Sequence, residues 1–172
     1  GKRVLDVFSY IGAWGIQLLN AGADSLTAID ASEFALDCLE KNAALNGFAD
    51  TVTCLQGNAF DALHALLEQG ETFDIIVLDL PAFIKRKKAF NPGLQGYQKC
   101  NELALRLLDK QGLLVSASCS MHLSDANLQL AVQRAARHID RELSLVHHGG
   151  HAADHPVHPA MDETRYLKAQ FY

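Results

Sequence analysis

This chain of 172 residues lacks several features that would place it in a familiar class. No apolar run reaches the roughly 18 residues that a membrane-spanning helix needs. A charged, strand-like segment at the start argues against a secretory signal peptide, so we expect no membrane association. The cysteines form no CxxC pair, which excludes a zinc ribbon or a redox motif; they are Cys38, Cys54, Cys100 and Cys119. Because isolated thiols fit a reducing cytosol, a cytoplasmic location is predicted.

The chain also lacks an excess of positive charge. Its 15 Lys and Arg residues are outnumbered by 20 Asp and Glu residues, which gives a formal net charge of −5. This is the wrong sign for a domain that binds nucleic acid by bulk charge alone. Contact with RNA would need a local basic patch or another domain. There is no internal repeat or low-complexity linker, and the apolar content of 49% predicts one globular domain over residues 1–172.

Strand-like apolar runs alternate with amphipathic helical stretches along the chain. Strands are predicted at Arg3–Phe8, Ser25–Asp30, Thr51–Gln56, Phe73–Asp79 and Leu113–Ser118. Helices are predicted at Ala13–Ala21, Ser32–Asn46, Ala59–Gln69, Gly96–Asp109 and Asp125–His138. This alternation is typical of an α/β fold with a doubly wound parallel sheet and helices on both faces. Leu143–His147 and Arg165–Phe171 would add two more strands, the last of them antiparallel.

The segment Val4–Gly12 is the most informative stretch of the chain. It reads V-L-D-V-F-S-Y-I-G, an apolar run that passes a carboxylate and turns into an amphipathic segment. The pattern predicts a buried strand, a tight loop and a helix start. A second acid, Asp30, closes the next strand-like run. Because ligands of open α/β sheets bind at the carboxyl ends of strands, Asp6 and Asp30 predict a nucleoside ligand with a charged tail.

The glycines after the first strand do not fit a dinucleotide site. Gly12 and Gly15 do not make the G-x-G-x-x-G pattern that admits a pyrophosphate, so a dehydrogenase is a distant alternative. Asp6 would repel a phosphate but suits the cationic groups of S-adenosylmethionine. Asp30 would accept hydrogen bonds from the ribose, and Asn58 would pair with the adenine edge. The simpler alternative is that each acid merely ends a strand.

A set of short motifs covers essentially the whole chain. The motifs are Val4–Gly12, Ala28–Ser32, Gly57–Phe60, Asp79–Phe83, Gly96–Tyr97, Ser118–Ser120, Asp154–Val157 and Tyr166–Lys168. In this order they resemble those of the class I S-adenosylmethionine-dependent RNA methyltransferases. They are most similar to the catalytic domain of the large-subunit rRNA cytosine-C5 methyltransferases that carry an N-terminal PUA domain. The resemblance implies a Rossmann-like fold with a mostly parallel seven-stranded sheet, and ribosomal RNA as the partner.

The resemblance also implies which residues hold the cofactor, S-adenosylmethionine. They are Asp6, Phe8, Ser9, Tyr10, Gly12, Asp30, Ala31, Ser32, Asn58, Ala59, Phe60, Asp79 and Pro81. Two positions depart from the family pattern: Asn58 stands where Asp is usual, and Leu80 replaces a proline that would stiffen the loop beside the target base. Asn58 can still form a hydrogen bond with adenine, so we expect the cofactor to bind.

The family's upstream segment and PUA domain are absent from this chain, which begins at Gly1 rather than Met. We therefore expect a missing N-terminal region to help bind RNA, and weak RNA affinity for the chain alone. A homodimer is left open by the sequence.

Cytosine C5 is a poor nucleophile, and the resemblance implies covalent catalysis to overcome this. The thiolate of Cys119 would add to C6, which activates C5, while Asp79 would hold N3 of the base. The alternative for Cys119 is a small buried hydrophobe, the usual state of a free cysteine. Many enzymes that make 5-methylcytosine in RNA carry a second Cys where this chain has Ala82. The base that removes the C5 proton is therefore not identified by the sequence.

Two charged or titratable runs are further candidates. The basic run Lys85, Arg86, Lys87 and Lys88 would contact RNA phosphates at the mouth of the site, or would simply be a solvated loop. Five histidines fall within residues 147–158. No cysteine lies nearby and the segment contains prolines, so no metal site is predicted. We interpret Trp14 and Tyr97 as packing residues.

Two rival functions remain open at this point. The first is a methyltransferase on the same fold with another target, such as guanine N2 or a small molecule. Replacement of Cys119 by Ala would separate the two, because a direct-transfer enzyme would keep most of its activity. The second rival is a paralogue that binds RNA without catalysis, which the departures at Asn58 and Leu80 would mark.

Overall fold

The fold is built on one sheet with the predicted parallel core. The computed structural model describes residues 1–84 and 86–172, and within them seven strands form one sheet in the order β3-β2-β1-β4-β5-β7-β6. The strands are β1 (Arg3–Val7), β2 (Ser25–Asp30), β3 (Val52–Gln56), β4 (Phe73–Leu80), β5 (Leu108–Ser118), β6 (His147–Gly149) and β7 (Lys168–Phe171). Strands β1 to β5 pair in parallel, and β7 is antiparallel to both β5 and β6. This confirms the predicted mostly parallel sheet.

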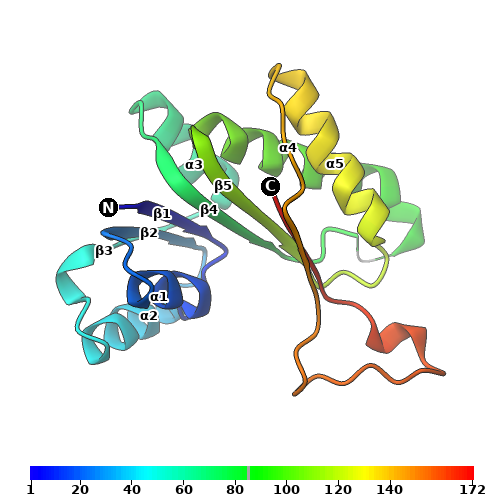
Figure 1. Ribbon diagram of the computed structural model, residues 1–172, viewed down its shortest axis with the longest axis horizontal. Helices are drawn as coiled ribbons and strands as arrows, with labels where there is room; N and C mark the ends of the chain where they lie inside the picture. Colours follow the sequence, from blue (N-terminus) through cyan, green and yellow to red (C-terminus); the bar gives the residue numbers. More distant parts are fainter. Residues whose placement is uncertain (85) are drawn as a thin grey trace.

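Helices cover both faces of the sheet, as Figure 1 shows. They are α1 (Ala13–Asn20), α2 (Glu33–Leu45), α3 (Ala59–Glu68), α4 (Phe90–Leu107) and α5 (Asp125–His138). Strand β1 contributes side chains to the cores on both faces, because successive side chains of a strand point to opposite faces. Leu5 and Val7 join the larger core beneath α3, α4 and α5, whereas Val4 joins the smaller core beneath α1 and α2.

Helix α4 begins earlier than the sequence predicts. The predicted helix started at Gly96, with Pro81–Gln95 left irregular, but α4 starts at Phe90. Pro92 lies in the first turn, where the backbone N–H that proline lacks would have no partner inside the helix. Gly93 allows the helix to approach the preceding loop, since a Cβ at this position would lie 2.4 Å from Cγ1 of Ile84. Pro92 and Gly93 therefore belong to the helix, and Gly93 lies at its close contact with the preceding loop.

The strands near the carboxyl terminus also differ from prediction in their bounds. The predicted strand Leu143–His147 is wrong for its first four residues, because β6 starts at His147. The segment before β6 instead passes α5, and its Val146 N–H donates to the carbonyl oxygen of Phe171. Strand β7 starts at Lys168 rather than Arg165. No helix in the described part of the chain is both long and apolar enough to cross a bilayer.

Candidate active site

The predicted site residues meet at one edge of the sheet. Parallel strands end at the same edge. Asp30 is the last residue of β2, Asp79 is next to last in β4, and Cys119 directly follows β5. The register of β4 and β5 places Asp79 opposite Ala117, two residues before Cys119. The strand order therefore brings together groups that are far apart in sequence.

Asp6 lies inside the protein, beneath the loop that follows β1. Its side chain is completely buried, and one carboxylate oxygen, Oδ2, accepts a hydrogen bond of 3.0 Å from the Gly15 N–H. The other oxygen, Oδ1, has no partner among the described residues. Burial raises the pKa of Asp6 to about 7; the Gly15 N–H opposes the shift, and the nearby charges of Asp79 and Asp30 add to it. A cation at this point would offset the cost of the buried charge.

The loop between β1 and α1 is strained. Phe8 and Tyr10 have positive φ angles of 63° and 48°, which side-chain-bearing residues rarely adopt. Three hydrogen bonds hold this loop: Ser9 N–H to the Ile29 carbonyl, Tyr10 N–H to Asp30, and Gly12 N–H to the Ser9 carbonyl. Such strain is typical of binding loops whose shape matters for function. Tyr10 stays 65% exposed, whereas the buried Ser9 hydroxyl has no partner among the described residues.

Asp30 joins this loop to the start of α2. Its Oδ2 accepts a hydrogen bond of 2.8 Å from the Tyr10 N–H, and its Oδ1 accepts one of 2.9 Å from the Ser32 N–H. Ser32 in turn caps α2, because its side chain accepts from the Ala35 N–H. Each carboxylate oxygen keeps a free lone pair. Asp30 can therefore orient two loops and still accept hydrogen bonds from a ligand.

Asn58 and Phe60 lie at the start of α3. The Asn58 side-chain oxygen caps this helix by accepting a hydrogen bond of 2.9 Å from the Phe60 N–H. The NH₂ of Asn58 remains able to donate to a ring nitrogen such as those of adenine. The ring centroids of Phe60 and Phe83 are 6.2 Å apart. Lys99 Nζ lies 5.6 Å from the centroid of the Phe60 ring. Contact of Asn58 or Phe60 with adenine stays a prediction.

Trp14 is a site residue that sequence reasoning missed. Its indole Nε1–H donates a hydrogen bond of 3.2 Å to Oδ2 of Asp79, so it is more than the packing residue we expected. Burial raises the pKa of Asp79, and the indole donor works against that shift. The two residues are 65 positions apart, so no periodic pattern in the sequence indicates their contact. The sequence signal that could have found it is the position of Trp14 at the start of α1, next to the β1–α1 loop.

Tyr97 clamps the loop that follows β4. Its buried hydroxyl donates to the Pro81 carbonyl at 2.9 Å and accepts from the Phe83 N–H at 3.3 Å. The same hydroxyl shares a hydrogen bond of 2.9 Å with Ser118 Oγ. Tyr97 is thus packed in the core, as predicted, but it also ties the Asp79 loop to the end of β5.

Cys119 is exposed, while its neighbours Ser118 and Ser120 are buried. The Ser120 N–H donates to Ser118 Oγ, which fixes the backbone on both sides of the thiol. The exposure of Cys119 excludes the alternative of a small buried hydrophobe. The residue faces solvent directly after β5, the strand that pairs with the Asp79 strand β4, where a substrate can reach it.

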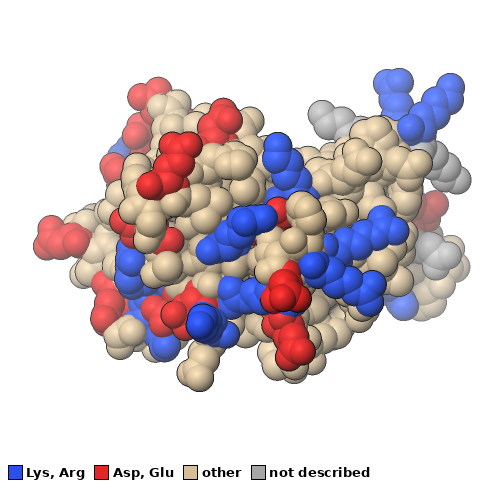
Figure 2. Space-filling view, turned by 90° about the horizontal axis from the view of Figure 1, so that it is seen from above, with Lys and Arg blue, Asp and Glu red and all other residues tan. Residues whose placement is uncertain are grey.

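The basic run is partly described. Lys85 and the side chain of Lys87 lie outside the described residues, and Arg86 and Lys88 are exposed. Contact of this run with RNA stays a prediction. Figure 2 shows that Lys and Arg side chains on the face seen from above are interspersed with acidic groups. Lys99, Arg134 and Arg137 border one hollow that also contains Glu102.

Two histidines of the segment 147–158 contact other groups of the protein. His151 Nε2 accepts hydrogen bonds from the N–H groups of Tyr166 and Leu167, at 3.1 and 2.9 Å. His155 lies 3.2 Å from the Asp154 carboxylate. Within the described part of the chain, no three His, Cys, Asp or Glu side chains gather as metal ligands would.

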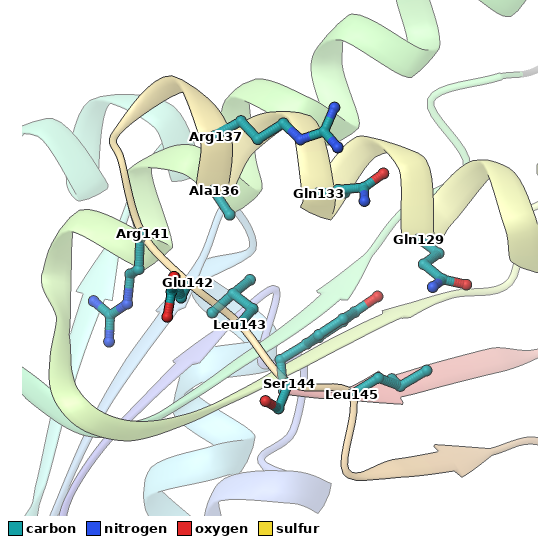
Figure 3. Close-up of a pocket in the computed structure, with 10 residues that line it drawn as sticks. Gln129, Gln133, Ala136, Arg137, Arg141, Glu142, Leu143, Ser144 and Leu145 are labelled. Carbon is teal, nitrogen blue, oxygen red and sulfur yellow. The ribbon is translucent and has the colours of Figure 1, made fainter.

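A separate surface cavity of about 390 Å³ contains none of the predicted site residues. Figure 3 shows its labelled side chains, which come from α5 and from the segment after it, such as Gln133 and Leu143. Tyr172, which also lines it, pairs with Leu114 in the middle of β5 rather than at its carboxyl end. This cavity is therefore not part of the site at the sheet edge.

Comparison with known proteins decides the family. A family model described as a methyltransferase domain matches residues 1–163. The chain belongs to this methyltransferase domain family. The methyl donor of such a domain is S-adenosylmethionine, so the predicted enzyme class and cofactor are confirmed.

Similar proteins agree with this assignment. The chain is 37% identical over 169 residues to ribosomal RNA large subunit methyltransferase I of Shewanella denitrificans, covering 98% of this chain and 43% of that protein. It is 38% identical over 168 residues to the protein of the same name from Aeromonas salmonicida, covering 97% and 42%. The chain thus spans less than half the length of these relatives.

Solved structures share the fold of this methyltransferase domain. A SAM-dependent methyltransferase from Agrobacterium tumefaciens superposes with a TM-score of 0.75 at 19% identity, covering 99% of this chain and 55% of that one. Trm5b from Pyrococcus abyssi superposes with a TM-score of 0.69 at 20% identity, covering 99% and 43%. These likenesses confirm the predicted Rossmann-like architecture.

The residues at the sheet edge suit the charge of S-adenosylmethionine. Asp6, Asp30 and Asp79 are close enough for the charges of the latter two to raise the pKa of Asp6. Among the described residues, the buried atoms Asp6 Oδ1 and Ser9 Oγ have no hydrogen-bond partner, which is uncommon for buried polar atoms. The cationic groups and hydroxyls of S-adenosylmethionine are chemically suited to such atoms. Which cofactor atom each residue contacts stays a prediction.

Proposed function

We propose that this chain is the catalytic domain of a cytoplasmic enzyme that methylates C5 of a cytosine in large-subunit ribosomal RNA. The observation that carries the proposal is the exposed thiol of Cys119 beside the strand of Asp79. A covalent route to C5 needs an accessible thiol near a group that can hold the base. The names of the relatives, which specify large-subunit rRNA, support the substrate class.

The proposed cofactor residues surround the carboxyl ends of β1, β2 and β3. S-adenosylmethionine, when bound, supplies an electrophilic methyl group. We propose that Asp6 and Ser9 take its charged tail, that Asp30 takes the ribose hydroxyls, and that Asn58 takes the adenine edge. The strained loop at Phe8–Gly12 fixes these groups before binding, since its backbone is already held by Asp30.

The proposed chemistry then uses Cys119 and Asp79. The Cys119 thiolate adds to C6 of the cytosine, and the electron pair of the C5–C6 bond becomes available at C5 to accept the methyl group. Asp79 hydrogen-bonds N3 while charge develops on the ring. Burial raises the pKa of Asp79, so it carries a proton more readily than an exposed carboxyl and can donate to N3. Loss of the C5 proton and departure of the thiolate restore the aromatic ring.

RNA affinity is proposed to depend on more than this chain. The net charge of −5 is unfavourable for a polyanion, and the described basic residues of the loop, Arg86 and Lys88, are few. We propose that they contact phosphates beside the target base. Since the chain spans 43% of its relatives' length, the remaining part of a protein of that kind would supply further RNA contacts.

The proposal is tested by methylation of ribosomal RNA with the full-length protein, followed by mass analysis of the nucleosides. We expect 5-methylcytosine from the wild type and a loss of at least 1,000-fold, on the order expected for removal of a nucleophile, in Cys119→Ala. Cys38→Ala is the matched control and should retain activity, because Cys38 lies in α2. A Cys119→Ala enzyme that keeps most activity would indicate direct transfer to another acceptor. Absence of cofactor binding by calorimetry would indicate a paralogue that binds RNA without catalysis.

A further inference from the structure

Lys168 reaches the turn that carries Cys119. It lies in β7, with its Cα opposite that of Ser118 in β5. Its side chain runs to the end of that strand, where Nζ donates a hydrogen bond of 2.6 Å to the Ser120 carbonyl. The whole residue is 7% exposed, which is unusual for lysine. The amine is thus held against Ser120, the residue directly after Cys119.

A cavity adjoins this amine. It has a volume of about 590 Å³, and its wall includes Lys168, Met121, Asp125 and His148. Met121, two residues beyond Cys119 in the chain, also lines this cavity. His148 Nε2 lies 3.3 Å from an Asp125 carboxylate oxygen, at the start of α5. Lys168 therefore lies between this cavity and the segment that follows β5.

The proposed reaction still needs a base for the C5 proton. C5 is bonded to C6, which carries the sulfur of Cys119 in the adduct, so the base must lie within a few ångströms of the thiol. Ala82 has no proton acceptor in its side chain. Asp79 is engaged by Trp14 and is proposed to hold N3. Among the described residues, Lys168 brings an amine to the carbonyl of Ser120, directly after Cys119.

We infer that Lys168 is the general base that removes the C5 proton from the methylated adduct on Cys119. This inference rests on the proposed function. The neutral amine takes the proton from C5, and the electrons of the C5–H bond form the C5–C6 double bond. The C6–S bond breaks, its electron pair leaves with the sulfur as thiolate, and Lys168 becomes an ammonium. The ammonium then loses its proton to solvent through the cavity.

The surroundings of Lys168 favour this role at the right stage. Burial lowers the pKa of Lys168, whereas the charges of Cys119 and Asp125 act in the opposite direction. In the adduct the sulfur is bonded to C6 and carries no charge, so one of the two groups that favour the ammonium is removed. Arg165 adds positive charge to the cavity wall.

Trapping of the adduct on ordinary RNA tests the inference. Full-length wild type, Lys168→Met and Lys168→Arg are incubated with unmodified target RNA and S-adenosylmethionine, and the products are separated on a denaturing gel. We expect both variants to accumulate a covalent protein–RNA adduct that already carries the methyl group, identified by mass spectrometry. Their turnover should fall by about 100-fold or more, the usual effect of losing a general base.

Lys168→Arg separates a base from a structural support. Arginine preserves the positive charge and the donor to the Ser120 carbonyl, but it does not lose a proton in proteins. A structural role would therefore be rescued by arginine, with normal turnover and no adduct, and that result would overturn the inference. His148→Gln is the matched control in the same cavity and should turn over without adduct.

The outcome distinguishes this inference from the proposed function. RNA containing 5-fluorocytosine traps a covalent enzyme at the step before proton loss, whichever base is used. If the wild type forms that adduct but Lys168→Arg does not accumulate one on unmodified RNA, Lys168 is not the base while the proposed function stands. If the wild type forms no adduct with the fluorinated RNA, the proposed function itself fails. Calorimetric binding of S-adenosylhomocysteine confirms that each variant is folded.

Discussion

Replacement of Asp6 by Asn should make the protein more stable at pH 8. Asp6 is fully buried with one unpartnered oxygen, and its pKa is raised from 3.8 to about 7. In the unfolded chain the carboxyl ionises near pH 4. Between these values the folded protein binds more protons than the unfolded chain, so the free energy of unfolding falls as the pH rises from about 4 to 7. Above pH 7 the buried charge is a fixed cost.

The size of this cost follows from the shift. About three pKa units correspond to about 4 kcal/mol, and relaxation around a buried charge reduces this to about 2–4 kcal/mol. Asn at this position keeps the acceptor for the Gly15 N–H and has no charge. We therefore expect urea unfolding at pH 8 to show a gain of about 2–4 kcal/mol in Asp6→Asn, and no gain at pH 4. Asp50→Asn, at an exposed position of the short 3-10 helix Ala49–Thr51, is the control.

Two results would refute this reasoning. Equal stability of Asp6→Asn and the wild type at pH 8 would mean that the carboxylate is not buried without a partner. A gain that is the same at pH 4 and pH 8 would mean that the effect is not caused by ionisation. The same substitution should weaken binding of S-adenosylmethionine, because the proposed partner of its charged tail is lost.

Three further predictions concern the contacts around the site. Tyr97→Phe removes a hydroxyl with three hydrogen-bond partners and should lower the free energy of unfolding in urea by about 2–3 kcal/mol, whereas Tyr166→Phe should change it little. Trp14→Phe removes the indole donor, so the pKa of Asp79 should rise and any limb of the pH–rate profile that depends on Asp79 should move to higher pH; an unmoved profile would contradict the contact. Asn58→Ala removes the cap of α3, which is worth about 1 kcal/mol of stability, and should also weaken S-adenosylhomocysteine binding in calorimetry. Ser124→Ala removes the cap of α5 and should lower stability without changing that binding.

Much of the fold could be predicted because its signals are local. The alternation of strand-like and amphipathic helical stretches predicts β2 and α5 with their observed bounds, Ser25–Asp30 and Asp125–His138. Errors arose where tertiary packing overrides local preference. Pro92 and Gly93 are usual loop residues, yet α4 includes both because the helix packs closely on the preceding loop. The strand β6 was misplaced because its bounds depend on pairing with β7, which local pattern does not specify.

The candidate site could be predicted in part for the same reason. Residues at strand ends, such as Asp30 and Asp79, follow from the alternation and the strand order. The exposure of Cys119 could not be predicted, since a free cysteine is more often buried. The hydrogen bond from Trp14 to Asp79 and the reach of Lys168 to the Ser120 carbonyl join distant parts of the chain. Such contacts depend on the register and on side-chain direction, which motif spacing does not reveal.

Covalent trapping shows whether Cys119 is the nucleophile. The full-length protein and its Cys119→Ala variant are incubated with S-adenosylmethionine and target RNA that contains 5-fluorocytosine. Fluorine at C5 cannot leave as a proton, so we expect a stable protein–RNA adduct that disappears in Cys119→Ala. If no adduct forms although the cofactor and the RNA are bound, or if the adduct persists in Cys119→Ala, the account of Cys119 as the nucleophile is contradicted.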